Sequence, residues 1–188
     1  RLGASIASDT LVYQEKDGQF WTGVGKTRDR RFIIISSSSS TSSEVRFVDA
    51  KTPDEEFKLF RAREKGIEYG IIHHGEHFYI LTNEDAINFK IMKTHESKIA
   101  KENWQPFIEH RDDVLIDDID AFTAHIVISQ REQGLQKLRF FDVKSGQFKP
   151  INFSEAVYSV DLDANPEFAT NIVRYRYTSL TTPESVYD

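Results

Sequence analysis

The segment at 23–27, GVGKT, is the first candidate for chemistry, because glycine loops followed by Lys and Thr cradle phosphate groups. Such a loop also needs a glycine five positions before Gly25 and a helix after Thr27. Position 20 is Phe20, and the residues that follow Thr27 have the pattern of a strand. The sequence therefore indicates a structural segment here rather than a nucleotide site, and we expect no cofactor.

Three histidines and a glutamate form the second candidate, His73, His74, Glu76 and His77. Imidazole and carboxylate groups bind metal ions, but successive side chains on a strand point to opposite faces. His73 and His74 would need a bend to meet at one ion, and the spacing differs from the helical His-Glu-x-x-His arrangement. We expect a polar turn near Gly75 and no metal site.

Carboxylates are concentrated in a third segment, at Asp112, Asp113, Asp117, Asp118 and Asp120. Paired carboxylates serve as acid and base or as cation ligands, but Ca²⁺ loops carry a glycine within the ligand run. This segment has no glycine. A solvated edge of the fold or the mouth of a tunnel is the favoured interpretation.

Serine nucleophiles need a base and an oxyanion site, often on a Gly-x-Ser-x-Gly turn between strand and helix. The nearest match, GASIA at 3–7, lacks the second glycine. The run of small hydroxyl residues at 36–43 contains no glycine either and reads as a solvated turn. We therefore expect no catalytic residue in this chain and no hydrolysis by it.

The elements that position these residues are strands. Residues 32–35 form an apolar, β-branched run, and after the hydroxyl segment Val45 and Phe47 alternate with Glu44 and Arg46. This pattern is typical of two antiparallel strands joined by a polar turn. The glycines at 23 and 25 interrupt the strand before them, at positions where backbones approach closely.

The same unit recurs about every 46 to 48 residues, a period that predicts four-stranded blades of a β-propeller. No segment has the apolar period of an amphipathic helix, and 95–103 reads as a loop. We expect an all-β fold of four-stranded antiparallel blades. The predicted parts are the end of a preceding blade at 1–19 with a strand at 9–16, then blades at 20–63, 67–110 and 113–153, and a truncated blade at 157–188.

Composition limits the partners. The net charge of −6 argues against nucleic acid and favours a cationic ligand or peptide. The sequence has no cysteine, which fits a reducing compartment, so we expect a cytoplasmic protein and leave the periplasm open. No apolar run approaches about 18 residues, so we expect no membrane span. The first residue is not Met and the last residues look like a strand, which suggests an excised fragment.

Several strings resemble the propeller domain of the prolyl oligopeptidase family. They are LVYQEKD (11–17), TNEDAINF (82–89) and ENW (102–104). Three more resemble its oligopeptidase B branch, namely REQGL (131–135), NPEF (165–168) and YRYTSLTTPESVYD (175–188). The resemblance covers essentially the whole chain in the right order.

This resemblance implies about four blades of a seven-bladed propeller that caps an α/β-hydrolase domain. Such enzymes cut short peptides after Lys or Arg with a Ser-Asp-His triad that lies in the hydrolase domain, outside this chain. The propeller acts as a size filter, and the loops between the second and third strands of each blade face the catalytic cavity. Here those loops are 36–43, 83–88, 131–134 and 178–184, and the candidate substrate-facing residues are Ser37, Ser39, Asn83, Asn88, Arg131 and Glu132.

Two other interpretations fit the repeat pattern. An independent propeller scaffold would bind another protein, although the repeats lack a Trp-Asp signature. A propeller glycosidase would need two carboxylates facing each other across a pocket. In either case an open row of blades exposes apolar faces at its ends, so we expect the isolated chain to self-associate.

Overall fold

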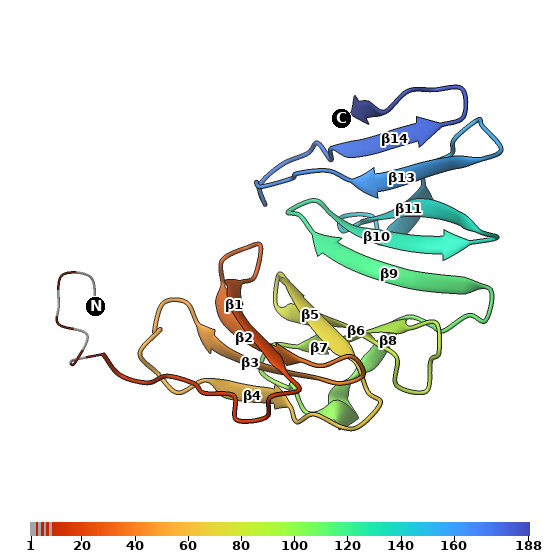
Figure 1. Cartoon of the computed structure of the whole chain (residues 1–188). Helices are drawn as coiled ribbons and strands as arrows, with labels where there is room; N and C mark the ends of the chain where they lie inside the picture. Colours follow the sequence, from red (N-terminus) through yellow and green to blue (C-terminus); the bar gives the residue numbers. More distant parts are fainter. Residues whose placement is uncertain (1–2, 4, 6, 8) are drawn as a thin grey trace.

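The computed structural model describes residues 3, 5, 7 and 9–188, and these residues form fifteen strands with a 3-10 turn at Lys101–Asn103. The strands make four antiparallel sheets that follow one another along the chain in a curved row (Figure 1). The prediction of an all-β fold built from four-stranded antiparallel blades is confirmed. In the described part of the chain, no helix is long and apolar enough to span a membrane.

Each sheet is a blade whose strands pair in chain order. Blade 1 holds β1 (Trp21–Lys26), β2 (Phe32–Ser38), β3 (Ser43–Asp49) and β4 (Lys58–Arg61). Blade 2 holds β5 (Tyr69–His74), β6 (His77–Thr82), β7 (Lys90–His95) and β8 (Gln105–Ile108). Blade 3 holds β9 (Val114–Ala121), β10 (His125–Glu132), β11 (Leu135–Asp142) and β12 (Gln147–Pro150). Blade 4 holds β13 (Tyr158–Leu162), β14 (Tyr175–Ser179) and β15 (Ser185–Tyr187).

Short turns fix the register of the central hairpins. Between β10 and β11 the turn is only Gln133 and Gly134, both with positive φ, 54° and 79°. Two such residues match the right-handed twist of the flanking strands. Glu132 therefore pairs with Leu135, and the strands stay in register for eight pairs.

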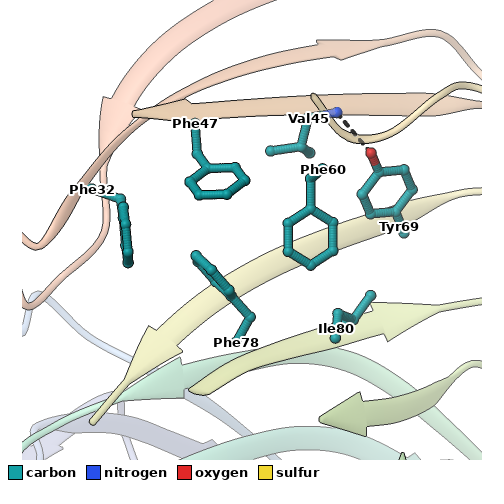
Figure 2. Packing of buried hydrophobic residues seen from close by; sticks show 7 residues of the cluster. All are labelled: Phe32, Val45, Phe47, Phe60, Tyr69, Phe78 and Ile80. Carbon is teal, nitrogen blue, oxygen red and sulfur yellow. Dashed lines mark hydrogen bonds between the residues drawn. The ribbon is translucent and has the colours of Figure 1, made fainter. Parts of the chain in front are cut away.

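The hydrophobic core lies between neighbouring blades rather than within one sheet. Between blades 1 and 2, aromatic rings pack mostly edge to face around Phe78, which is fully buried (Figure 2). The Tyr69 hydroxyl crosses the same junction, since it accepts a hydrogen bond from the Val45 amide at 2.8 Å and donates to the Arg61 carbonyl at 2.6 Å. The blades are thus joined by apolar packing and by satisfied polar groups.

The next two junctions follow the same plan. The core between blades 2 and 3 contains Tyr79, Ile91, Ile116, Ile119, Ala121, Ile126 and Ile128. The core between blades 3 and 4 contains Phe122, Val127, Leu138, Val160, Val173 and Tyr177. The first strands β1, β5, β9 and β13 lie along the concave side of the row (Figure 1).

Three local predictions are wrong. Residues 9–16 form no strand, and Glu15 there is bound to Arg63, at 2.5 Å, in an irregular segment. A Cβ placed on Gly23 or Gly25 meets no atom within 4 Å, so these glycines mark an open strand rather than close backbone approach. The hydroxyl loop is shorter than 36–43, because β2 continues to Ser38 and β3 begins at Ser43.

Candidate functional site

The loops that the sequence assigned to a catalytic cavity leave the blades at one common end. They join the second and third strand of each sheet and comprise residues 39–42, 83–89, 133–134 and 180–184. The hairpins between first and second strands, 27–31, 75–76, 122–124 and 163–174, leave the opposite end. The two sets are called the 2–3 loops and the 1–2 loops below.

The two serine candidates serve blade 1 itself. Ser37 lies in β2, not in a loop, and only 2% of its surface is exposed. Its hydroxyl lies 3.0 Å from the Thr22 hydroxyl and 3.2 Å from the Tyr13 hydroxyl. Ser39 is in the loop, where its hydroxyl accepts the Ser42 amide at 3.1 Å and shapes the turn. The predicted loop position of Ser37 is wrong, because polar partners inside the sheet allow the strand to continue through the serine run.

The two asparagine candidates lie in the 83–89 loop and fasten it to neighbouring segments. Asn83 accepts the Glu68 amide at 2.8 Å and donates to the Gly66 carbonyl at 3.1 Å, in the connection from blade 1. Asn88 donates to the Asp112 carbonyl at 2.8 Å, in the connection to blade 3. Both side chains therefore position the 2–3 loop of blade 2 with respect to its neighbours.

Arg131 and Glu132 occupy the end of β10, and the turn beyond them is only 133–134, so their predicted place within a loop is wrong. Successive strand residues point to opposite faces. Arg131 is directed to Asp117, with Nε 3.3 Å from the carboxylate. Glu132 is directed to Lys137, at 2.8 Å, and that hydrogen bond lowers the pKa of Glu132, with burial acting against it and Arg111 adding to it.

The two side chains line different cavities. Arg131 borders one of about 380 Å³, whose wall includes Asp117 and Asp118 of β9 and Asp161 of β13. Glu132 borders another of about 590 Å³ against β11 and β12. A register shift in β9, opposite Ser129 and Gln130, exposes Asp117 and Asp118 side by side, as a β-bulge does. Blades 3 and 4 therefore share a hollow that is lined by five Asp side chains and by Arg131 and Lys137.

The carboxylates of the acidic segment have cationic neighbours. Asp113 binds Arg111 at 2.6 Å, and Asp120 binds Arg28 at 2.5 Å. Among the described residues, no group of three or more His, Asp or Glu side chains is arranged to hold a metal ion. Asp113, Asp117 and Asp120 are thus held in ion pairs with arginines at blade edges and junctions.

The GVGKT segment is the edge strand β1 followed by a turn. The Thr27 hydroxyl is buried and accepts the Phe32 amide at 3.0 Å, so it closes the turn into β2. A strand follows where a phosphate loop requires a helix, which leaves no helix N-terminus for a phosphate.

The histidine segment holds a buried cluster that the sequence did not reveal. His73 is 1% exposed, and its ring nitrogens lie 2.6 Å from Asp29 and 3.0 Å from Glu96. Asp29 belongs to blade 1, whereas His73 and Glu96 belong to blade 2. Burial acts to raise the pKa of Asp29, but the hydrogen bonds from His73 and Thr27 outweigh it, and the pKa is lowered. The position of His73 on the same strand face as Tyr69 and Ile71 was the available signal.

The comparisons with known proteins agree with this geometry. Residues 1–188 match the family model described as prolyl oligopeptidase, N-terminal beta-propeller domain. The chain is 38% identical to dipeptidyl aminopeptidase BI of Pseudoxanthomonas mexicana and 30% identical to protease 2 of Moraxella lacunata. These matches cover 100% of this chain and 26% of each relative, so the chain spans about a quarter of their length.

Solved structures give the same result. Oligopeptidase B from Trypanosoma brucei, in a closed form with covalently bound antipain, matches with a TM-score of 0.90 and 30% identity over 99% of this chain and 28% of that one. Oligopeptidase B from Leishmania major matches with a TM-score of 0.88 and 25% identity over 98% of this chain and 27% of that one. From the repeated blades, their junctions and these matches together, this chain belongs to the prolyl oligopeptidase family and corresponds to part of its N-terminal β-propeller domain.

Proposed function

We propose that this chain is the gating, substrate-admitting wall of a serine peptidase that resembles oligopeptidase B and cleaves short peptides after Lys or Arg. The observation that carries the proposal is the match of all four blades, in order, to oligopeptidase B over nearly the whole chain. In this proposal the catalytic groups lie in a hydrolase domain, and these blades decide which peptides reach them.

The charge of the hollow between blades 3 and 4 supports a basic substrate. Asp117, Asp118 and Asp161 border one hollow between blades 3 and 4, and the whole chain carries a net charge of −6. Five Asp side chains in the lining outnumber its two cations, Arg131 and Lys137, and an excess of negative charge raises the local concentration of cationic ligands. A peptide with Lys or Arg is therefore drawn toward these blades, more strongly at low salt.

The rigidity of the blade junctions supports a size filter. Neighbouring blades share dense cores, and Tyr69, Asn83 and Asn88 add hydrogen bonds across or beside the junctions. A wall built in this way does not stretch to admit a folded protein, because packed interiors resist deformation.

The test is a substrate series on the gene-encoded protein, which here means the full product of the gene that contains these 188 residues. Short peptides with Lys at the cleaved position are compared with the same peptides carrying norleucine, which keeps the chain length and removes the charge. The expected result is a much higher kcat/KM for Lys and Arg peptides, and no cleavage of the same site inside a folded protein. Equal rates for Lys and norleucine, or efficient cleavage of folded substrates, would contradict the proposal.

A further inference from the structure

The 1–2 loop of blade 1 reaches across to blades 3 and 4. Arg28 lies in this loop. Its guanidinium group donates through Nη2 to the Asp120 carboxylate of β9 at 2.5 Å, and through Nη1 to the Asn165 carbonyl in the 163–174 loop. The centre of the Arg28 guanidinium also lies 4.7 Å from the centre of the Phe122 ring. One side chain thus joins the first blade of the row to the third and the fourth.

The other 1–2 loops meet at the same place. The ring of His74, beside the blade 2 turn, donates through Nε2 to the Thr123 carbonyl at 3.2 Å. The Thr123 amide donates to the Phe168 carbonyl at 3.0 Å, and the His74 and Phe168 ring centres lie 6.0 Å apart. Residues in or beside the 1–2 loops of all four blades are therefore tied together.

The 1–2 loops continue from the ends of the first strands, which lie along the concave side of the row (Figure 1). The concave side of a row of propeller blades faces the central channel. Loops from blades 1 and 4, separated by two blades along the row, can meet only if they extend over that channel. The network around Arg28 consequently covers part of one channel mouth.

We propose that Arg28 is a latch that holds the 1–2 loops over this mouth and keeps peptides from entering there. Its flat guanidinium group binds two acceptors in different blades while its face lies on an aromatic ring, a combination that Lys does not reproduce. Arg28 and Asp120 are each about a quarter exposed, so water screens the pair only in part. The inference rests on the proposed function, since it assigns entry to the end that carries the 2–3 loops.

Arg30 supplies a matched control within the same loop. It is exposed, and within the described residues its side chain makes no hydrogen bond or ion pair. Its φ is 61°, so Ala and Arg meet similar backbone strain there. Arg30→Ala therefore removes the same charge as Arg28→Ala without touching the latch.

The experiment uses the gene-encoded protein with Arg28→Ala, Arg28→Lys and Arg30→Ala, read by two measurements. Hydrogen exchange is followed in the 122–124 and 163–174 loops, and kcat/KM is measured for a short basic peptide and for a long unfolded chain with the same cleavage site. In Arg28→Ala we expect about tenfold faster exchange in these loops, the effect of losing about 1.4 kcal/mol. We also expect several-fold better use of the long chain relative to the short peptide, an intermediate result for Arg28→Lys, and wild-type behaviour for Arg30→Ala.

Unchanged exchange in both Arg28 variants would refute the latch. Faster exchange with an unchanged preference for the short peptide would refute the role of Arg28 in peptide entry, but it would still show that Arg28 holds the loops together. If the wild-type protein cleaves no basic peptide, both the proposed function and the role in entry are refuted. The exchange data then still decide whether Arg28 holds the loops together. Should Arg28→Ala fail to fold, Arg28→Lys carries the same comparison.

Discussion

Glu84 provides the sharpest test of how the blades are fastened at the end that carries the 2–3 loops. It lies in the 83–89 loop of blade 2 and binds Arg61 of blade 1 through two parallel hydrogen bonds, at 2.7 and 2.9 Å. Lys101 adds a third at 2.5 Å. The Arg61 and Glu84 side chains are only 9% and 12% exposed. We predict that Glu84→Gln destabilises the chain by loosening the junction between blades 1 and 2.

The magnitude follows from the lowered pKa of Glu84. Hydrogen bonding to Arg61, against the opposing effect of burial and with further help from Lys101, lowers that pKa from 4.5 to about 2. Such a shift corresponds to about 3 kcal/mol at neutral pH. Lys101 is 57% exposed, so water reaches one side of the cluster and screening reduces the figure to about 1–2 kcal/mol.

The pH dependence has a definite sign. The folded-state pKa of Glu84 is below the unfolded value, so its stabilising effect is complete above about pH 4.5 and is lost as the pH falls toward 2. The difference between wild type and Glu84→Gln should therefore be largest near pH 7. More than half of it should be gone by about pH 3.

The assay is urea unfolding of the 188-residue chain over this pH range, with Glu64→Gln as the control. Glu64 also binds Arg61, at 2.7 Å, but its side chain is 57% exposed. An exposed pair contributes about 0–1 kcal/mol, so the control should change little. Equal effects of the two substitutions, or an effect of Glu84→Gln that does not vary with pH, would refute the reasoning.

Three further predictions concern the core, the candidate site and assembly. Phe78→Ala should destabilise the chain by about 3–5 kcal/mol in urea unfolding, because the ring is fully buried between blades 1 and 2; a loss below about 1 kcal/mol would contradict the packing. In the gene-encoded protein, replacing both Arg131 and Glu132 with Ala should change kcat/KM for basic peptides several-fold, because each side chain borders a cavity; unchanged kinetics would show that both are plain surface residues. The isolated chain should self-associate through exposed apolar residues such as Trp21 and Val157 at its two ends, and light scattering that shows a monomer at every concentration would exclude this.

The sequence was a good guide to the sheets because their signal is local. The alternation around Val45 and Phe47 and the repeat of about 46 to 48 residues depend only on which face of each strand is buried. The strand predicted at 9–16 has a similar local pattern but no neighbouring strand to pair with in the described chain. Pairing partners therefore decide between a strand and an irregular segment when the local pattern allows both.

The candidate site was less predictable because its contacts join distant parts of the chain. His73 meets carboxylates 44 and 23 positions away, and Arg28 meets acceptors 92 and 137 positions away. None of these four separations affects the local pattern of apolar residues. Ser37 shows the converse case, since a polar run that reads as a loop stays in a strand when Thr22 and Tyr13 satisfy its hydroxyl.

A structure of the gene-encoded protein with a covalently bound peptide aldehyde ending in Arg tests the central claim most directly. We predict that blades 1 to 4 form consecutive blades of the propeller, with the 2–3 loops facing the bound peptide and the Arg28 network at the far mouth of the channel. A structure in which the 2–3 loops face solvent, or in which this chain lies away from the path to the peptide, would contradict the account.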